Sequence, residues 1–328
     1  MTKTRIAIIG AGIAGLHLAN KLHPGAELCV FEKARGVSGR LSTRYADPFQ
    51  FDHGAQYFTA RSAAFQAFLA PFIADTTVKE WTPRITTLAK GERPYKRDWF
   101  EPHYVASPRM NRLCQRMAEG LDIRLPFEIR TLQREHGAWI AHDSTGGMHG
   151  PFDWVISTAP APQSSQLMPS SFSGHEALAR VRMSGCYSVL IGMDAPLPWS
   201  WEVAVVKDSP LAWIAANHSK PERASKATSL LLQSTNEWAE EHINADVPAM
   251  QTLLLAELQS LTGFDASDAP YLTTHRWRYA AVEEAAGEPY LLDTSLQLAV
   301  CGDGCLGGRV EAAWQSADAL ADTLRRSL

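Results

Sequence analysis

The N-terminal segment carries a glycine pattern between an apolar run and a helix-forming run. Residues 5–9 read RIAII, GAGIAG follows, and LHLANKL continues after it. This order is typical of a buried parallel strand that turns directly into a helix. Gly10 permits a tight turn, Gly12 lets the backbone approach a phosphate, and Gly15 lets the helix pack closely on the strand. The segment therefore predicts a dinucleotide-binding unit with a phosphate at the helix N-terminus.

Polar residues continue this pattern after the next strand. The run ELCVFE ends in Glu32, where a dinucleotide fold needs a carboxylate for a ribose hydroxyl. KARGVSGRLSTRY follows, and its arginines and glycines offer guanidinium groups and backbone N–H groups to a second phosphate region. A solvated basic loop remains the alternative for any single arginine. FQFDHGAQYF, residues 49–58, then brings polar and aromatic residues around Gly54, which suits the edge of a ring system.

A second glycine-rich turn lies late in the chain, in CGDGCLGGRVEAAWQSA at residues 301–317. LQLAVCGD predicts a last parallel strand with Asp303 at its carboxyl end, and GGRVEAAWQSADALADTL predicts a helix. Ligands bind outside the carboxyl ends of parallel strands, so both glycine turns are expected to face one crevice. FAD fits this pair of turns, with Glu32 on the adenosine ribose and Asp303 on the ribityl or pyrophosphate region. The second helix N-terminus would favour the anionic reduced flavin. NAD alone would not require the second turn.

The middle of the chain has a different pattern. Residues 77–104 and 183–275 contain runs that alternate apolar and polar residues, which predicts an antiparallel sheet with one buried face. EWAEEHI and PAMQTLLLAELQSLTGF have helical spacing. We therefore expect an α/β fold with a discontinuous Rossmann-like FAD-binding domain made of residues 1–76, 105–182 and 276–328. Residues 77–104 and 183–275 would form a second, mainly antiparallel β-sheet domain with helices, acting as a substrate domain.

Several motifs, spread over nearly the whole chain, resemble a known group of proteins. GAGIAG, EKARGVSGRLSTR and the late GD turn are similar to the glutathione-reductase-like, amine-oxidase-related FAD flavoproteins. DHGAQYFTAR and HRWRYA narrow the resemblance to the bacterial renalase family. The resemblance implies an FAD-dependent oxidase that converts 2- or 6-dihydronicotinamide isomers of NAD(P)H to NAD(P)+. Hydride would pass to flavin N5, and O2 would reoxidise the flavin to give hydrogen peroxide.

Two other functions stay open, because a fold does not fix a function. One is a flavin amine oxidase acting on a small amine. The other is a flavin-binding protein that acts through partners without turnover.

The motifs also predict individual site residues. In HRWRYA, His275, Trp277 and Tyr279 would share one strand face, while the two arginines on the other face could meet a phosphate or carboxylate. The alternative for His275 is that it lies on a half-buried strand with a structural role only. The expected substrate-positioning residues are Gln56, Tyr57, His275, Trp277 and Tyr279. The expected cofactor-binding residues are Gly10, Gly12, Ile13, Ala14, Gly15, Glu32, Lys33, Gly39, Arg40, Gly54, Ala55, Gln56, Asp303, Arg309, Val310 and Glu311.

Composition and residue spacing argue against several other classes of function. The formal net charge of −4 and the lack of a Lys/Arg run argue against nucleic acid as a partner. Neither a signal-peptide order nor an apolar stretch of the roughly 20 residues needed to cross a membrane occurs, so we expect a cytoplasmic enzyme with small-molecule partners. The five cysteines and eleven histidines lack metal-site spacing, so no metal is expected. Cys301 and Cys305 could be redox-active or attached to flavin, but inert buried thiols are the commoner case.

Overall fold

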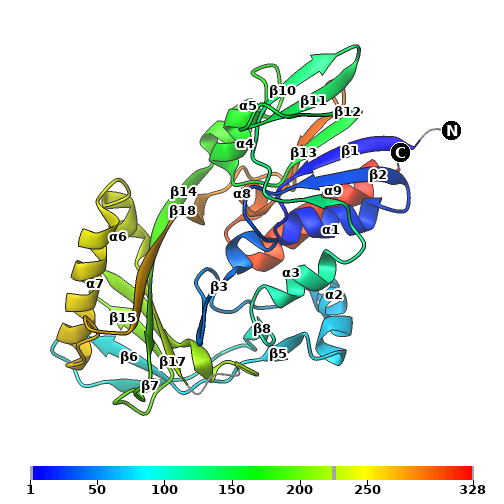
Figure 1. Cartoon of the computed structure of the whole chain (residues 1–328). Helices are drawn as coiled ribbons and strands as arrows, with labels where there is room; N and C mark the ends of the chain where they lie inside the picture. Colours follow the sequence, from blue (N-terminus) through cyan, green and yellow to red (C-terminus); the bar gives the residue numbers. More distant parts are fainter. Residues whose placement is uncertain (1–2, 224–226, 327–328) are drawn as a thin grey trace. The chain divides into compact units, whose positions relative to one another are not determined.

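The computed structural model describes residues 3–223 and 227–326 and divides the chain into two compact units (Figure 1). The first unit comprises Met1–Gly39, Cys114–Met183 and Val282–Leu328. The second unit comprises Arg40–Leu113 and Ser184–Ala281. Both units are assembled from segments that are distant in the sequence.

A six-stranded sheet in the order β19-β20-β13-β1-β2-β9 forms the centre of the first unit. The strands are β1 (Thr4–Ile9), β2 (Ala26–Phe31), β9 (Ile123–Arg124), β13 (Trp154–Ser157), β19 (Leu291–Asp293) and β20 (Leu298–Val300). All neighbours pair in parallel except β19, which runs antiparallel at the edge. The apolar runs predicted as buried strands thus lie in the middle of a parallel sheet, whose strands are buried on both faces.

Two helices from opposite ends of the chain lie side by side in this unit: α1 (Ile13–Leu22) and α9 (Val310–Leu324) (Figure 1). A three-stranded antiparallel sheet, β10 (Ile129–Glu135), β11 (Ala138–Asp143) and β12 (Met148–Phe152), contributes Trp139 and Phe152 to the same core as Phe31. The remaining helices are α3 (Arg112–Met117), α4 (Ala161–Leu167), α5 (His175–Arg180) and α8 (Asp303–Leu306).

The second unit contains a seven-stranded sheet in the order β18-β14-β17-β16-β15-β6-β7. Its strands are β6 (Ile85–Ala89), β7 (Tyr95–Arg97), β14 (Arg182–Met193), β15 (Val203–Lys207), β16 (Leu211–Ala216), β17 (Thr228–Ser234) and β18 (Tyr271–Glu284). The pairs β14–β17, β17–β16, β16–β15 and β6–β7 are antiparallel, whereas β15 and β6 are parallel. Residues of α6 (Asn236–Glu241) and α7 (Val247–Thr262), including Leu254 and Leu258, pack into the core beside this sheet.

Smaller elements complete the second unit. They are the hairpin β3 (Thr43–Ala46) and β4 (Phe49–Asp52), the pair β5 (Val78–Glu80) and β8 (Tyr104–Ala106), and α2 (Ala63–Ala74). Short 3-10 turns occur at Gly39–Leu41 and Asn217–Ser219. No helix in the described part of the chain has the length and apolar character needed to cross a membrane.

The predicted α/β class is confirmed, and the compact units differ from the expected boundaries at residues 40–76, 105–113 and 276–281. These segments belong to the second unit. The reason is non-local packing, because Phe49 and Phe51 of β4 bury their rings against Leu190 and Leu231 of the large sheet.

Leu190 therefore offers a test of this packing. Replacing fully buried Leu190 with alanine removes apolar contacts and leaves a cavity, so the free energy of unfolding should fall by about 2–5 kcal/mol. The matched control is Leu253→Ala on α7, where the side chain is 51% exposed and a change within about 0.5 kcal/mol is expected. Urea unfolding measures both variants. Equal losses would contradict the assignment of Leu190 to the core.

Candidate functional site

The first glycine turn connects β1 to α1 at very short range. Gly10 adopts φ +110°, which favours glycine, and a side chain at Gly15 would collide with the Gly10 carbonyl oxygen. Gly12 is the N-cap of α1, and a Cβ atom there would meet nothing within 4 Å. Space therefore remains in front of the helix N-terminus, where free backbone N–H groups can bind an anion such as a pyrophosphate.

Glu32 lies directly beside this turn. Its Oε2 accepts a hydrogen bond from the Ala11 N–H at 2.9 Å, and its Oε1 accepts one from the Ala34 N–H at 2.8 Å. An ionised carboxylate has about four acceptor positions, so it can hold the turn and still accept hydrogen bonds from ribose hydroxyls. Gly39 also lies close to the turn, because a Cβ atom at this position would be 3.6 Å from the Gly12 Cα. These residues fit the adenosine and pyrophosphate end of a dinucleotide.

The other expected residues of this turn vary in exposure. Ile13 and Ala14 are buried in the first turn of α1, whereas the Lys33 side chain is exposed. Their predicted contact with the cofactor stays a prediction.

The late turn follows β20, as predicted, but it contains a break. Gly302 has φ +138° and donates its N–H to the Ser316 Oγ at 2.9 Å, which ties the turn to α9. Asp303 is buried and begins α8, a single helical turn. The glycines after Leu306 then interrupt the helix, and α9 begins anew at Val310 with a buried Glu311 in its first turn. Arg309, the N-cap residue of α9, is exposed.

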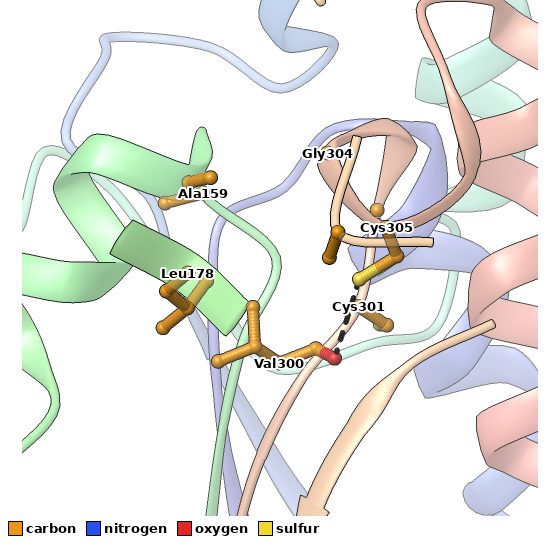
Figure 2. A pocket seen from close by; sticks show the side chains of 9 residues that line it. Ala159, Leu178, Val300, Cys301, Gly304 and Cys305 are labelled. Atoms are coloured by element: carbon orange, nitrogen blue, oxygen red, sulfur yellow. Dashed lines mark hydrogen bonds between the residues drawn. The ribbon is translucent and has the colours of Figure 1, made fainter. Parts of the chain in front are cut away.

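Figure 2 shows a small pocket beside the late turn, with room for about one water molecule. Its walls include Ala159, Leu178, Val300, Gly304 and Cys305. Burial raises the pKa of Cys305 to about 11. Burial also raises the pKa of the neighbouring Cys301 well above its usual range. Both thiols are therefore protonated at neutral pH, which matches inert rather than reactive cysteines.

In the second unit, Arg40 and the segment after β4 contact each other through the backbone. The Ala55 N–H donates to the Arg40 carbonyl oxygen at 2.9 Å, and a side chain at Gly54 would collide with that same oxygen. Glycine is required at position 54 because the Arg40 backbone lies against it. Arg40 also donates to the Ala280 carbonyl oxygen at 3.3 Å.

Gln56 is 6% exposed and forms hydrogen bonds at both ends of its amide. Its Nε2 donates to the carbonyl oxygens of Asp52 and Gly54, and its Oε1 accepts from Lys220 Nζ at 3.3 Å. These bonds fix the side chain within the protein. The predicted contact of Gln56 with cofactor or substrate stays a prediction.

The Asp52 carboxylate connects Gln56 to a fully buried ion cluster. Its Oδ2 lies 2.7 Å from Arg223 Nη2 and 3.2 Å from Lys220 Nζ, while its Oδ1 accepts from the Thr43 hydroxyl at 2.7 Å. Burial disfavours the charge, but the two cations outweigh burial and hold the pKa of Asp52 well below its usual range. Burial lowers the pKa of Lys220 to about 8, although Asp52 acts in the opposite direction.

Lys220 and Arg223, in the segment NHSKPER, were not predicted as site residues. Their segment is polar in sequence, which gives no signal of burial, and their partner, Asp52, is distant in the sequence. Only the fold brings the three charges together.

His275 and Trp277 of β18 form an aromatic cluster with His53. The ring centroids of His53 and His275 lie 4.9 Å apart, those of His53 and Trp277 lie 5.2 Å apart, and Trp277 Nε1 donates to the His53 carbonyl oxygen at 2.8 Å. Burial is the main cause that lowers the pKa of each histidine to about 4. His275 lowers the pKa of His53 further, and Arg44 lowers the pKa of His275 further. Both imidazoles are therefore neutral at neutral pH.

The two arginines of HRWRYA point elsewhere. Arg276 donates to the Ala245 carbonyl oxygen at 2.9 Å, and Arg278 donates to Asn244 Oδ1 at 3.1 Å. The strand alternation predicted for this motif thus separates the arginines from the aromatic face. Tyr279, two residues beyond Trp277 on β18, is half-buried.

Tyr57 belongs to a different aromatic cluster. Its ring centroid lies 4.1 Å from that of His103, 5.4 Å from that of Trp99 and 5.6 Å from that of Trp213. The structure therefore brings together two of the five expected substrate residues, His275 and Trp277, and places Tyr57 in another ring cluster.

Comparisons with known proteins agree with this geometry. Residues 8–72 match the NAD(P)-binding Rossmann-like domain, and residues 95–324 match the family described as flavin containing amine oxidoreductase. Renalase from Mus musculus is 23% identical over 98% of this chain and 99% of its own length.

Two solved structures share the fold. A putrescine oxidase with bound putrescine has a TM-score of 0.73 at 13% identity and covers 99% of each chain. An oxidoreductase from Methanosarcina mazei has a TM-score of 0.73 at 14% identity, over 97% of this chain and 100% of that one.

The hydrogen bonds of Glu32 give a first prediction for this site. Glu32→Ala removes a buried charged acceptor, so FAD should bind about 10- to 100-fold more weakly, as expected for a lost charge-assisted hydrogen bond. Glu27→Ala on β2, the strand that ends just before Glu32, is the control, because the Glu27 side chain is 65% exposed. Fluorescence titration with FAD measures both. Unchanged affinity in Glu32→Ala would show that other groups hold the ribose.

The ion cluster gives a second prediction. Asp52→Asn leaves two buried cations without their counter-ion, so the free energy of unfolding should fall by about 3–5 kcal/mol. Asp322→Asn is the control, since the Asp322 side chain is 56% exposed in its ion pair with Lys21, and this variant should lose less than about 1 kcal/mol. Urea unfolding separates the two cases, and a small loss in Asp52→Asn would mean that water reaches the cluster.

Proposed function

The chain belongs to the flavin containing amine oxidoreductase family, and on this premise we propose that it oxidises isomeric dihydronicotinamide dinucleotides. The protein is an FAD-dependent oxidoreductase. The full-length similarity to a renalase and the motifs DHGAQYFTAR and HRWRYA support the narrower substrate class. O2 as the electron acceptor and a cytoplasmic location are parts of the same proposal.

The observation that carries the proposal is the neutral cluster of His53, His275 and Trp277. A dihydronicotinamide gives up a hydride and has no proton that must leave with it, so its site needs a flat, uncharged surface rather than a strong base. The indole of Trp277 stacks on the His53 ring, the His275 ring stands edge-on to both, and the two imidazoles are neutral, so the cluster offers an uncharged aromatic face. Stacking and orientation are then the contribution of the protein.

Each group of residues has its own part in this reaction. The N-terminus of α1 holds the pyrophosphate, and Glu32 holds the adenosine ribose. Asp303 binds the ribityl or phosphate region beside the late turn. When bound, FAD supplies the hydride acceptor. His275, Trp277 and Tyr279 orient the nicotinamide ring, while the Asp52 cluster keeps the segment with Gln56 in place.

Oxidation of a small amine is the alternative, and the family match favours it at the level of the family. A protonated amine must lose a proton before or during hydride transfer, which calls for a base or an anion. The titratable groups of the cluster, His53 and His275, are neutral with pKa values of about 4, so they are weak bases. Amine oxidation thus needs a base that dihydronicotinamide oxidation does not need, so an experiment can distinguish the two functions.

Anaerobic stopped-flow absorbance tests the proposal. The FAD-loaded protein is mixed with NADH, with its 2- and 6-dihydro isomers, and with a panel of amines including putrescine. We expect fast bleaching of the oxidised flavin band by an isomer alone. In the fraction of the protein that retains FAD, the rate should be independent of pH from neutral down to the approach of pH 4, where protonation of His53 and His275 would place positive charge in the cluster.

Bleaching by an amine alone would establish the alternative function. Bleaching by none of the compounds would favour a flavoprotein without turnover of its own. His23→Gln, at the exposed end of α1, serves as a control variant that should reduce at the wild-type rate.

A further inference from the structure

Four side chains connect α1 and α9 across the interior of the first unit. His17 Nε2 lies 2.8 Å from Asp318 Oδ1, and Trp314 Nε1 donates to His17 Nδ1 at 3.0 Å. Lys21 Nζ donates to the same Asp318 oxygen at 2.8 Å. His17 and Lys21 lie one helical turn apart on α1, as do Trp314 and Asp318 on α9, so the contacts extend along both helices.

These contacts determine the protonation state of the imidazole. An indole N–H is only a donor, so His17 Nδ1 must be the unprotonated acceptor. The single ring proton is therefore on Nε2, which donates to Asp318. A protonated imidazole would carry N–H groups on both nitrogens and could no longer accept from Trp314. The observed arrangement thus requires neutral His17.

The position of these contacts connects them to the cofactor motifs. α1 begins at Ile13, immediately after the glycine turn, and α9 begins at Val310, immediately after the late turn. His17 and Trp314 each lie about one helical turn from these starts. The contact therefore sets how the two helix N-termini lie relative to each other within the first unit.

We propose that neutral His17 is a positioning residue that holds α1 and α9 in the arrangement that binds FAD, and that its protonation weakens FAD binding. This inference rests on the proposed placement of FAD at both glycine turns. It does not depend on which substrate the enzyme oxidises.

The surrounding charges fix the direction of the pH effect. Burial disfavours protonation of His17 and is the largest influence; Lys21 on α1 adds to it, while Asp318 and Asp322 on α9 oppose it. The net result is a lowered pKa of His17. The state with separated helices accepts the proton more readily than the packed state. FAD affinity should therefore be highest at neutral pH and fall as pH drops below the ordinary histidine range near about 6.5.

The experiment measures FAD release from the FAD-loaded full-length protein. The protein is diluted to a fixed concentration at steps across the range where histidine titrates, and free FAD is quantified by fluorescence. In the wild type, the dissociation constant should rise by up to about tenfold per pH unit through that range, the limit for one linked proton. In His17→Gln, which has no titrating ring, this pH dependence should disappear. His23→Gln on the same helix should retain the wild-type pH dependence.

A second measurement tests the hydrogen bond from Trp314 to His17 Nδ1 through its effect on the pKa of His17. Trp314→Phe keeps an aromatic ring but removes the donor to Nδ1, so NMR titration should give His17 a higher pKa in this variant than in the wild type. Equal pH dependence of FAD release in His17→Gln and the wild type would overturn the proposal, as would an unchanged His17 pKa in Trp314→Phe. Neither readout requires turnover, so failure of the dihydronicotinamide proposal would leave both results interpretable.

Discussion

The close approach of α1 to the end of β1 is the constraint on which the first unit depends. The helix starts so near the strand that Gly15 has no room for a side chain beside the Gly10 carbonyl oxygen. This proximity directs the helix N-terminus toward the carboxyl edge of the parallel sheet, where Glu32 and the late turn also lie. The start of α1, Glu32 and the late turn therefore all lie at the same edge of this sheet, where ligands of parallel sheets bind.

Two clusters of the second unit solve the problem of buried polar groups in different ways. In the second unit, Asp52 keeps its charge because two cations and a hydroxyl surround it. His53 and His275, in the same unit, lie in a desolvated environment that favours their neutral forms. A hydrogen-bonded ion cluster provides rigidity, whereas neutral imidazoles carry no charge into the site. One unit therefore contains both a buried charge held by counter-ions and buried imidazoles held neutral by desolvation.

Sequence patterns predicted the local features of this protein and missed those that depend on distant packing. The strand, glycine turn and helix around Gly10 are encoded within a few neighbouring residues, and so is the alternation in HRWRYA. The unit boundary after Gly39 was not predicted, because it follows from Phe49 and Phe51 packing on a sheet formed much later in the chain. The break between α8 and α9, in contrast, was signalled by two glycines that a continuous helix would disfavour.

The discontinuous first unit has a consequence for the order in which the protein folds during synthesis. β1 and α1 are made first, but their neighbours β20 and α9 come from the last part of the chain. The buried residues of α1 therefore lack part of their final surroundings until α9, which packs against it, has left the ribosome. The nascent N-terminal segment exposes apolar surface for nearly the whole period of translation, which makes it a natural target for chaperones.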